Sequence, residues 1–159
     1  MYVPTLYPNW GDQYDRMLRW YKKFEEIDRG KIDDSPNYFS YHDEVYAFFQ
    51  NCHHLKDWTI NDAKVSLPKN VVEQFINRNE YLKICADICN GTKHLKLDKS
   101  RSKISPKIEP SSTTIRVSEK GQIHKIKYTI ETTSGIYDAF KIATECVEKW
   151  KEFIEEHLK

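Results

Sequence analysis

Apolar residues recur at three- and four-residue spacing in four long stretches of the chain, which is the spacing of a helix with one buried face. The pattern predicts helices over residues 12–30, 41–60, 81–97 and 134–159. In the first helix the apolar stripe consists of Tyr14, Met17, Leu18, Tyr21, Phe24 and Ile27, and in the second it consists of Val45, Phe48, Phe49, Cys52 and Leu55. In the third helix the stripe consists of Leu82, Cys85, Ile88, Cys89, Thr92 and Leu95. In the last helix it consists of Ile136, Phe140, Ala143, Cys146, Val147, Trp150, Phe153, Ile154 and Leu158. A short piece over 69–76 has the same periodicity.

The period changes to two within residues 113–132. Ile115 and Val117 alternate with polar residues before Gly121, and apolar residues alternate with polar ones again after it. This pattern predicts a β-hairpin with a loop of several residues. Because an isolated hairpin is only marginally stable in water, we expect its apolar face to pack on the helices or on a partner chain.

Together these elements predict a mainly α fold, an antiparallel bundle of four principal helices with a β-hairpin inserted before the C-terminal helix. Residues 1–159 are expected to form one domain, long enough to bury a core. Residues 1–10 contain two prolines and no period, which predicts an N-terminal arm, and 98–112 is predicted to be a basic, proline-containing loop. The stripe of the last helix is too wide to stay in water, so that helix closes the bundle or pairs with a second copy, as in a homodimer.

Charge and hydropathy narrow the classes of partner. The formal net charge of +1 gives no global reason to expect nucleic acid or a membrane surface. No apolar run approaches the roughly 20 residues that span a bilayer. The first ten residues lack the basic start and apolar middle of a signal peptide. We therefore expect a cytoplasmic protein with no membrane partner.

The four cysteines, Cys52, Cys85, Cys89 and Cys146, all lie in helical patterns. In a cytoplasmic chain they are predicted to be free buried thiols rather than disulfides. The short Cys-x2-Cys spacing of structural zinc sites is missing, so we expect neither a metal nor another cofactor. The alternative is a metal site that combines cysteines with His53–His54.

A row of polar residues shares the third helical stretch with its apolar stripe. On a helix, Asp87, Asn90 and His94 lie together on one side, with Lys93 beside His94. A carboxylate, an amide and an imidazole in a row can position and move protons, with His94 as general acid or base. The alternative is an ordinary solvated helix face. Gly91 decides how far the row extends, because a helix that ends there leaves His94 in a loop.

The most basic part of the chain, residues 93–107, follows this row directly. Six lysines and arginines are opposed there only by Asp98, so the run can contact the phosphates of RNA or a nucleotide through charge alone. Lys93 and Lys96 are the residues expected to hold phosphate. The alternative is a solvated loop without a partner.

The second helical stretch contributes a further polar flank. Asn51, His54 and Trp58 lie three and four residues apart, and we assign them as candidate substrate-binding residues. Asn51 can hold a substrate or a helix end, and His54 can exchange protons. Hydrogen-bonded residues at the boundary of the core are the alternative for both.

Two dense blocks, NCHHLKDW at 51–58 and ICADICNGTKHLKL at 84–97, resemble a family of uncharacterised bacterial and mobile-element proteins of this size. More remotely, the helices and the polar block resemble HEPN domains, which are helical bundles, often dimeric, and include many metal-independent ribonucleases of toxin and phage-defence systems. The HEPN signature is an Arg, commonly followed by a polar residue, and a His four to six residues later. The corresponding place here reads Asn90-Gly-Thr-Lys-His94, which matches the His but not the Arg.

Two functional hypotheses follow from the residues and the resemblance. The favoured one is a non-catalytic interaction or ligand-binding module, dimeric, of a bacterial or phage-defence or mobile-element system. The missing Arg and the wide stripe of the last helix motivate it. The alternative is a HEPN-type metal-independent ribonuclease that uses His94 with Asn90 and Asp87 beside a basic loop.

Overall fold

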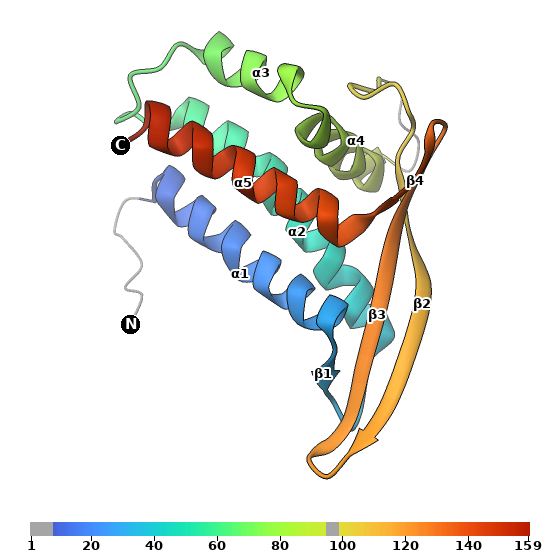
Figure 1. Cartoon of the computed structure of the whole chain (residues 1–159). Helices are drawn as coiled ribbons and strands as arrows, with labels where there is room; N and C mark the ends of the chain where they lie inside the picture. The colour runs from blue at the N-terminus through green and yellow to red at the C-terminus, as the bar shows by residue number, and fades with distance from the viewer. Residues whose placement is uncertain (1–7, 95–98) are drawn as a thin grey trace.

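The computed structural model of the protein describes the backbone of residues 8–94 and 99–159 and the side chains of 8–92 and 99–159. These residues form five helices and a four-stranded antiparallel sheet (Figure 1). In chain order the elements are α1 (Trp10–Arg29), β1 (Lys31–Ile32), α2 (Tyr38–Asn61), α3 (Lys69–Arg78), α4 (Glu80–His94), β2 (Lys107–Ser118), β3 (Gly121–Thr132), β4 (Gly135–Asp138) and α5 (Ala139–His157). The mainly α class predicted from the pattern is confirmed.

The first helix begins earlier than its apolar stripe suggests. Asn9 accepts a hydrogen bond from the N–H of Gly11, and its own N–H donates to Asp12, so a capping box starts α1 at Trp10. The predicted N-terminal arm over 1–10 is therefore too long at its end, and residues 1–7 lie outside the described part of the chain.

The core lies where α1, α2, α4 and α5 meet. The predicted stripe of α2 is fully buried, and it faces Met17, Phe24 and Ile27 of α1. Aromatic rings fill much of the space: the rings of Phe24 and Phe49 meet edge-on with centroids 6.2 Å apart. Trp150 of α5 is fully buried in the same cluster.

The short piece predicted over 69–76 is a helix of its own, α3, so the described residues form five helices and a bundle of four is not confirmed. Asn79 breaks the chain between α3 and α4, because its side chain accepts hydrogen bonds from the N–H groups of Tyr81 and Leu82 and so caps α4. Residues 84–89 of α4 are all buried, so this part of the helix has no solvent-exposed face. α4 is therefore covered on several sides, including by the loop that follows it.

The predicted hairpin is confirmed and longer than expected, but its predicted loop of several residues is wrong, because only Glu119 and Lys120 separate β2 from β3. β3 pairs with β2 along its whole length and with β1 and β4 on its other side. Its inward side chains, Ile126, Tyr128 and Ile130, are buried against the helices. The hairpin runs along one side of the helices, and its turn projects beyond them (Figure 1).

Part of the loop predicted over 98–112 is strand. Residues 107–112 belong to β2, and Pro110 is tolerated there because the outer side of β2 needs no N–H donor. The register shifts between Pro110 and Ser112, which marks a bulge at that point.

The predicted start of the last helix at Ser134 is wrong. Residues 135–138 pair with β3 as β4, and Asp138 caps α5 by accepting a hydrogen bond from the N–H of Lys141 at 2.8 Å. Ile136 consequently lies on β4, 70% exposed, instead of on the buried stripe. The backbone of this segment finds partners in β3, which the local pattern does not reveal.

Among the described residues, none of the helices combines the length and the apolar character needed to cross a membrane.

Candidate functional site

Asp87, predicted to orient a catalytic histidine, is buried and holds the loop that follows α4. Its carboxylate accepts hydrogen bonds from the backbone N–H groups of Arg101 and Ser102, at 2.7 and 2.9 Å. The hydroxyls of Ser100 and Ser102 donate to it as well. Because the side chain is 1% exposed and four donors surround it, its oxygens are occupied in fixing residues 100–102 over α4.

The rest of the predicted row continues along the same helix. Asn90 is half-buried, and the helix runs through Gly91 to His94, so the backbone positions of the row stay on one side of α4. The side chains of Lys93 and His94 and the whole of Lys96 lie outside the described residues. A catalytic role for His94 with Asn90, and phosphate binding by the lysines, therefore stay predictions.

Two of the four cations in the described part of the basic run, Arg101 and Lys107, have carboxylate partners. The guanidinium of Arg101 lies 3.0 Å from Glu73 of α3, and the ammonium of Lys107 pairs with Glu109. A phosphate bound by these two residues would compete with both carboxylates. The described residues thus add no support for RNA or a nucleotide at 93–107, and this partner also stays a prediction.

The flank predicted on α2 contacts two neighbouring helices: Asn51 and Trp58 contact α1, and His54 lies against α4. Asn51 accepts a hydrogen bond from Gln13 of α1 at 3.2 Å, and the guanidinium of Arg16 lies 5.3 Å from the ring centre of Trp58. These contacts join α1 to α2, which fits the boundary-residue alternative. Substrate binding by Asn51, His54 and Trp58 stays a prediction.

The two histidines weighed as metal ligands have different surroundings. His54 Nε2 lies 3.8 Å from the sulfur of Cys89, on the side of α4. His53 is buried, and its Nδ1 has no hydrogen-bond partner in the described structure. Burial and, next, the nearby charge of Lys56 lower the pKa of His53 to about 4.

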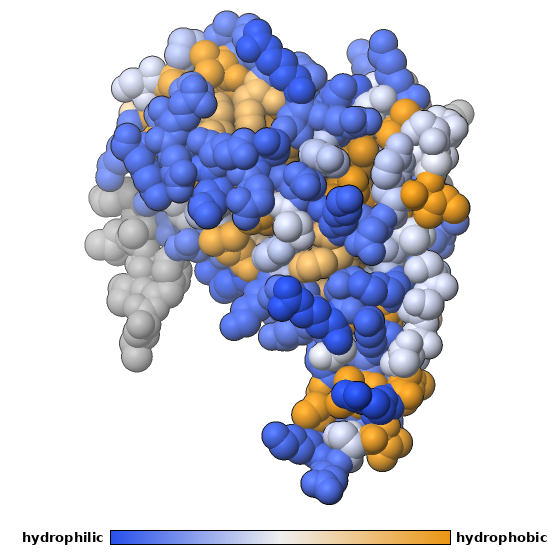
Figure 2. Space-filling model, in the orientation of Figure 1, coloured by the Kyte–Doolittle hydropathy of each residue, from blue (hydrophilic) through white to orange (hydrophobic). Residues whose placement is uncertain are grey.

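The outer edge of β2 is the largest unpaired element of the sheet among the described residues. Near the hairpin turn, Ile115 is 56% and Val117 78% exposed. A hydrogen bond of 2.9 Å between Tyr38 and His124 holds the start of α2 against the sheet. The next residue, Phe39, is 85% exposed. Figure 2 shows apolar surface at this projecting end of the molecule. The combination of a free edge and apolar side chains can bind another strand.

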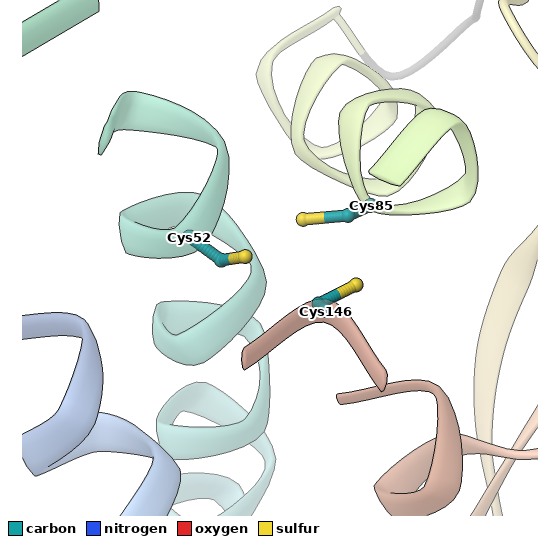
Figure 3. Close-up of side chains that lie close together, drawn as sticks. All are labelled: Cys52, Cys85 and Cys146. Atoms are coloured by element: carbon teal, nitrogen blue, oxygen red, sulfur yellow. The ribbon is translucent and has the colours of Figure 1, made fainter. Parts of the chain in front are cut away.

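A second arrangement lies inside the core. Cys52 of α2, Cys85 of α4 and Cys146 of α5 point toward one another (Figure 3), with their sulfurs all within 4.8 Å of each other. All three are free thiols and at most 1% exposed. The thiol of Cys85 donates to the carbonyl of Phe49 at 3.2 Å, and that of Cys146 to the carbonyl of Tyr81 at 3.4 Å.

The three thiols differ in acidity. Burial raises the pKa of each one. At Cys52, the polar groups of Cys146, Cys85 and Trp150 nearby outweigh burial and lower the pKa of the thiol, whereas the pKa values of the other two remain raised.

Reasoning from the sequence missed this cluster because no two of its cysteines are close in the chain. The signal that could have found it is that each cysteine lies on the apolar stripe of a different helix. Stripes of helices that pack together share one core, so three such cysteines can meet.

No family model, no curated protein and no solved structure matches this chain. The resemblance to HEPN domains therefore stays a prediction.

Proposed function

We propose that this chain is a non-catalytic interaction module that forms a dimer by pairing the outer edge of β2 with the same edge of a second copy. The observation that carries the proposal is this edge: it is free among the described residues, and exposed apolar side chains flank it. A free strand edge presents unpaired N–H and C=O groups, and pairing with another strand satisfies them.

A second copy is a suitable partner because residues 112–118 are self-complementary. This part of β2 follows the bulge, pairs regularly with β3 and contains one charged residue, Arg116. An antiparallel pair centred on Ile115 sets Thr113 opposite Val117 of the second copy, with Arg116 opposite Thr114. No like charges then face each other. Pairs of β-branched side chains in such positions contribute about 0.2–1 kcal/mol each relative to alanine pairs.

The hydrogen bonds of Asp87 to the loop support the non-catalytic part of the proposal. Asp87 is engaged by four donors of the loop, so it is not free to orient an imidazole. The buried free thiols support a reducing compartment such as the cytoplasm for this module.

The oligomeric state tests the proposal. Light scattering after gel filtration should give the mass of a dimer for the native protein and of a monomer for Ile115→Lys, because a lysine at the centre of the pair faces its own copy. Ile136→Lys is the matched control, since Ile136 is also an exposed isoleucine and lies on β4 of the same sheet. A native protein that stays monomeric at its highest soluble concentration would overturn the proposal.

A cross-link tests the pairing itself. An Ile115→Cys variant should form a symmetric intermolecular disulfide under mild oxidation, because the two copies of residue 115 lie opposite each other in the proposed pair. The same change at Ile136 should give no such product. Equal cross-linking at both positions would mean random collision rather than a defined interface.

A ribonuclease of HEPN type is the second candidate, and one observation favours it. α4 does not end at Gly91, so His94 stays on the same helix as Asn90. If the activity exists, the purified protein degrades RNA without added metal and His94→Ala does not. Intact RNA in both samples, over a panel of sequences, excludes this candidate.

A further inference from the structure

We propose that Cys52, Cys85 and Cys146 form a buried site for one trivalent thiophilic ion, of the class represented by arsenic(III). The site lies in the core, where α2, α4 and α5 meet, and is separate from the edge of β2. A bound ion would tie these three helices together.

The spacing of the sulfurs suits three bonds to one ion. An ion at the centre of three sulfurs that are each 4.8 Å apart lies about 2.8 Å from every sulfur, against the ~2.3 Å of a zinc–thiolate bond. Movements of each sulfur by about half an ångström therefore bring all three within bonding distance of the ion. Soft thiolate ligands select thiophilic ions over hard ones.

Charge decides which thiophilic ion fits. Besides one another, the groups that act most strongly on these thiols are Trp150 and Glu145, neither of which is a cation. Three thiolates with a divalent ion would leave a net charge of −1 in the core, and burying an uncompensated charge is costly. A trivalent ion leaves the complex neutral. Zinc would also require a fourth ligand, and the group of close ligand atoms among the described residues has three.

Trp150 provides an independent observation at the same place. Its indole N–H is fully buried and has no hydrogen-bond partner in the described structure. This N–H lies next to Cys52 but closes no hydrogen bond to its neutral thiol. A buried donor without an acceptor is unfavourable, and a thiolate of the loaded site supplies that acceptor.

The binding reaction balances without any change of oxidation state. Arsenite, As(OH)3, exchanges its three hydroxyl groups for the three thiols. Three As–O bonds break, three As–S bonds form, and each thiol proton leaves with a hydroxyl group as water. No oxidant or reductant takes part. Because the sulfurs are at most 1% exposed, arsenite enters only when the helices open locally, so binding is slow.

Native mass spectrometry of the reduced protein tests the site with arsenite alone as the probe. We expect one adduct per chain, with the mass of one arsenic atom less three hydrogens. Alanine at Cys52, Cys85 or Cys146 should abolish it. Cys89→Ala is the matched control: Cys89 is buried in α4 one turn after Cys85 but lies outside the thiol group, so the adduct should remain.

Thiol protection tests the native chain without any substitution. After arsenite loading, unfolding and brief alkylation, Cys89 should be modified and the other three cysteines protected. Absence of the adduct, an adduct that persists in the three alanine variants, or alkylation of all four cysteines would overturn the proposal. Tighter binding of zinc or cadmium than of arsenite would refute the argument from charge.

Discussion

The most informative perturbation is Asp87→Asn, because it keeps the shape of the side chain and removes its charge. Arg101 N–H and Ser102 N–H donate to different oxygens of the carboxylate. An amide offers one oxygen, so its NH2 group must face one of these donors. We therefore expect the loop over 100–102 to detach from α4.

The cost follows from the bonds that are lost. A hydrogen bond to a charged group contributes about 1.5–3 kcal/mol, and four of them end on this carboxylate. The losses do not add, because the detached loop bonds to water. A net destabilisation of about 3 kcal/mol is expected, which for a chain of this size lowers Tm by roughly 6–12 °C.

Two measurements check the effect at Asp87. Thermal unfolding followed by circular dichroism should show the lower Tm, and trypsin should cleave after Arg101 faster than in the native protein. Asp15→Asn is the control, since Asp15 is exposed on α1 and its change should stay within about 0.5 kcal/mol. An Asp87→Asn protein with native Tm and native cleavage rate would refute the assignment of Asp87 to loop anchoring.

Three further predictions concern pH and the backbone. Burial and Lys56 lower the pKa of His53 to about 4 in the folded protein. As pH falls below about 6.5, the histidine therefore takes up a proton in the unfolded chain before it does so in the folded one. The contribution of His53 to stability is complete above that pH and is lost as pH falls toward 4. Urea unfolding should show a loss of about 2 kcal/mol from pH 7 to pH 5 that His53→Gln largely removes, and an equal loss in both proteins would contradict this. Gly30→Ala should destabilise by about 1–3 kcal/mol, because Gly30 has φ 104° and an added Cβ would lie 3.2 Å from Ile123. Gly91→Ala, where an added Cβ meets nothing within 4 Å, should instead stabilise α4 by about 0.5–1 kcal/mol, and the two melting temperatures show whether these signs hold.

Reasoning from the sequence predicted the helices well because their cause is local. The buried stripes of α1 and α2 follow directly from three- and four-residue spacing, and the alternation around Gly121 predicted the hairpin. Boundaries were less accurate wherever a distant segment supplied the partner. Ile136 was placed on a helix because its spacing fits one, but the backbone around it pairs with β3.

The candidate site shows the same division. The sequence determined that Asp87 is polar and belongs to α4, but only the tertiary structure decided that a loop thirteen to fifteen residues later would enclose it. Likewise, the sequence determined that Cys52, Cys85 and Cys146 face the core, and only the packing of α2, α4 and α5 brought their sulfurs within 4.8 Å of each other. The physical reason is that periodicity reports which face of an element is buried, whereas the neighbour that buries it is chosen by the packing of the whole chain.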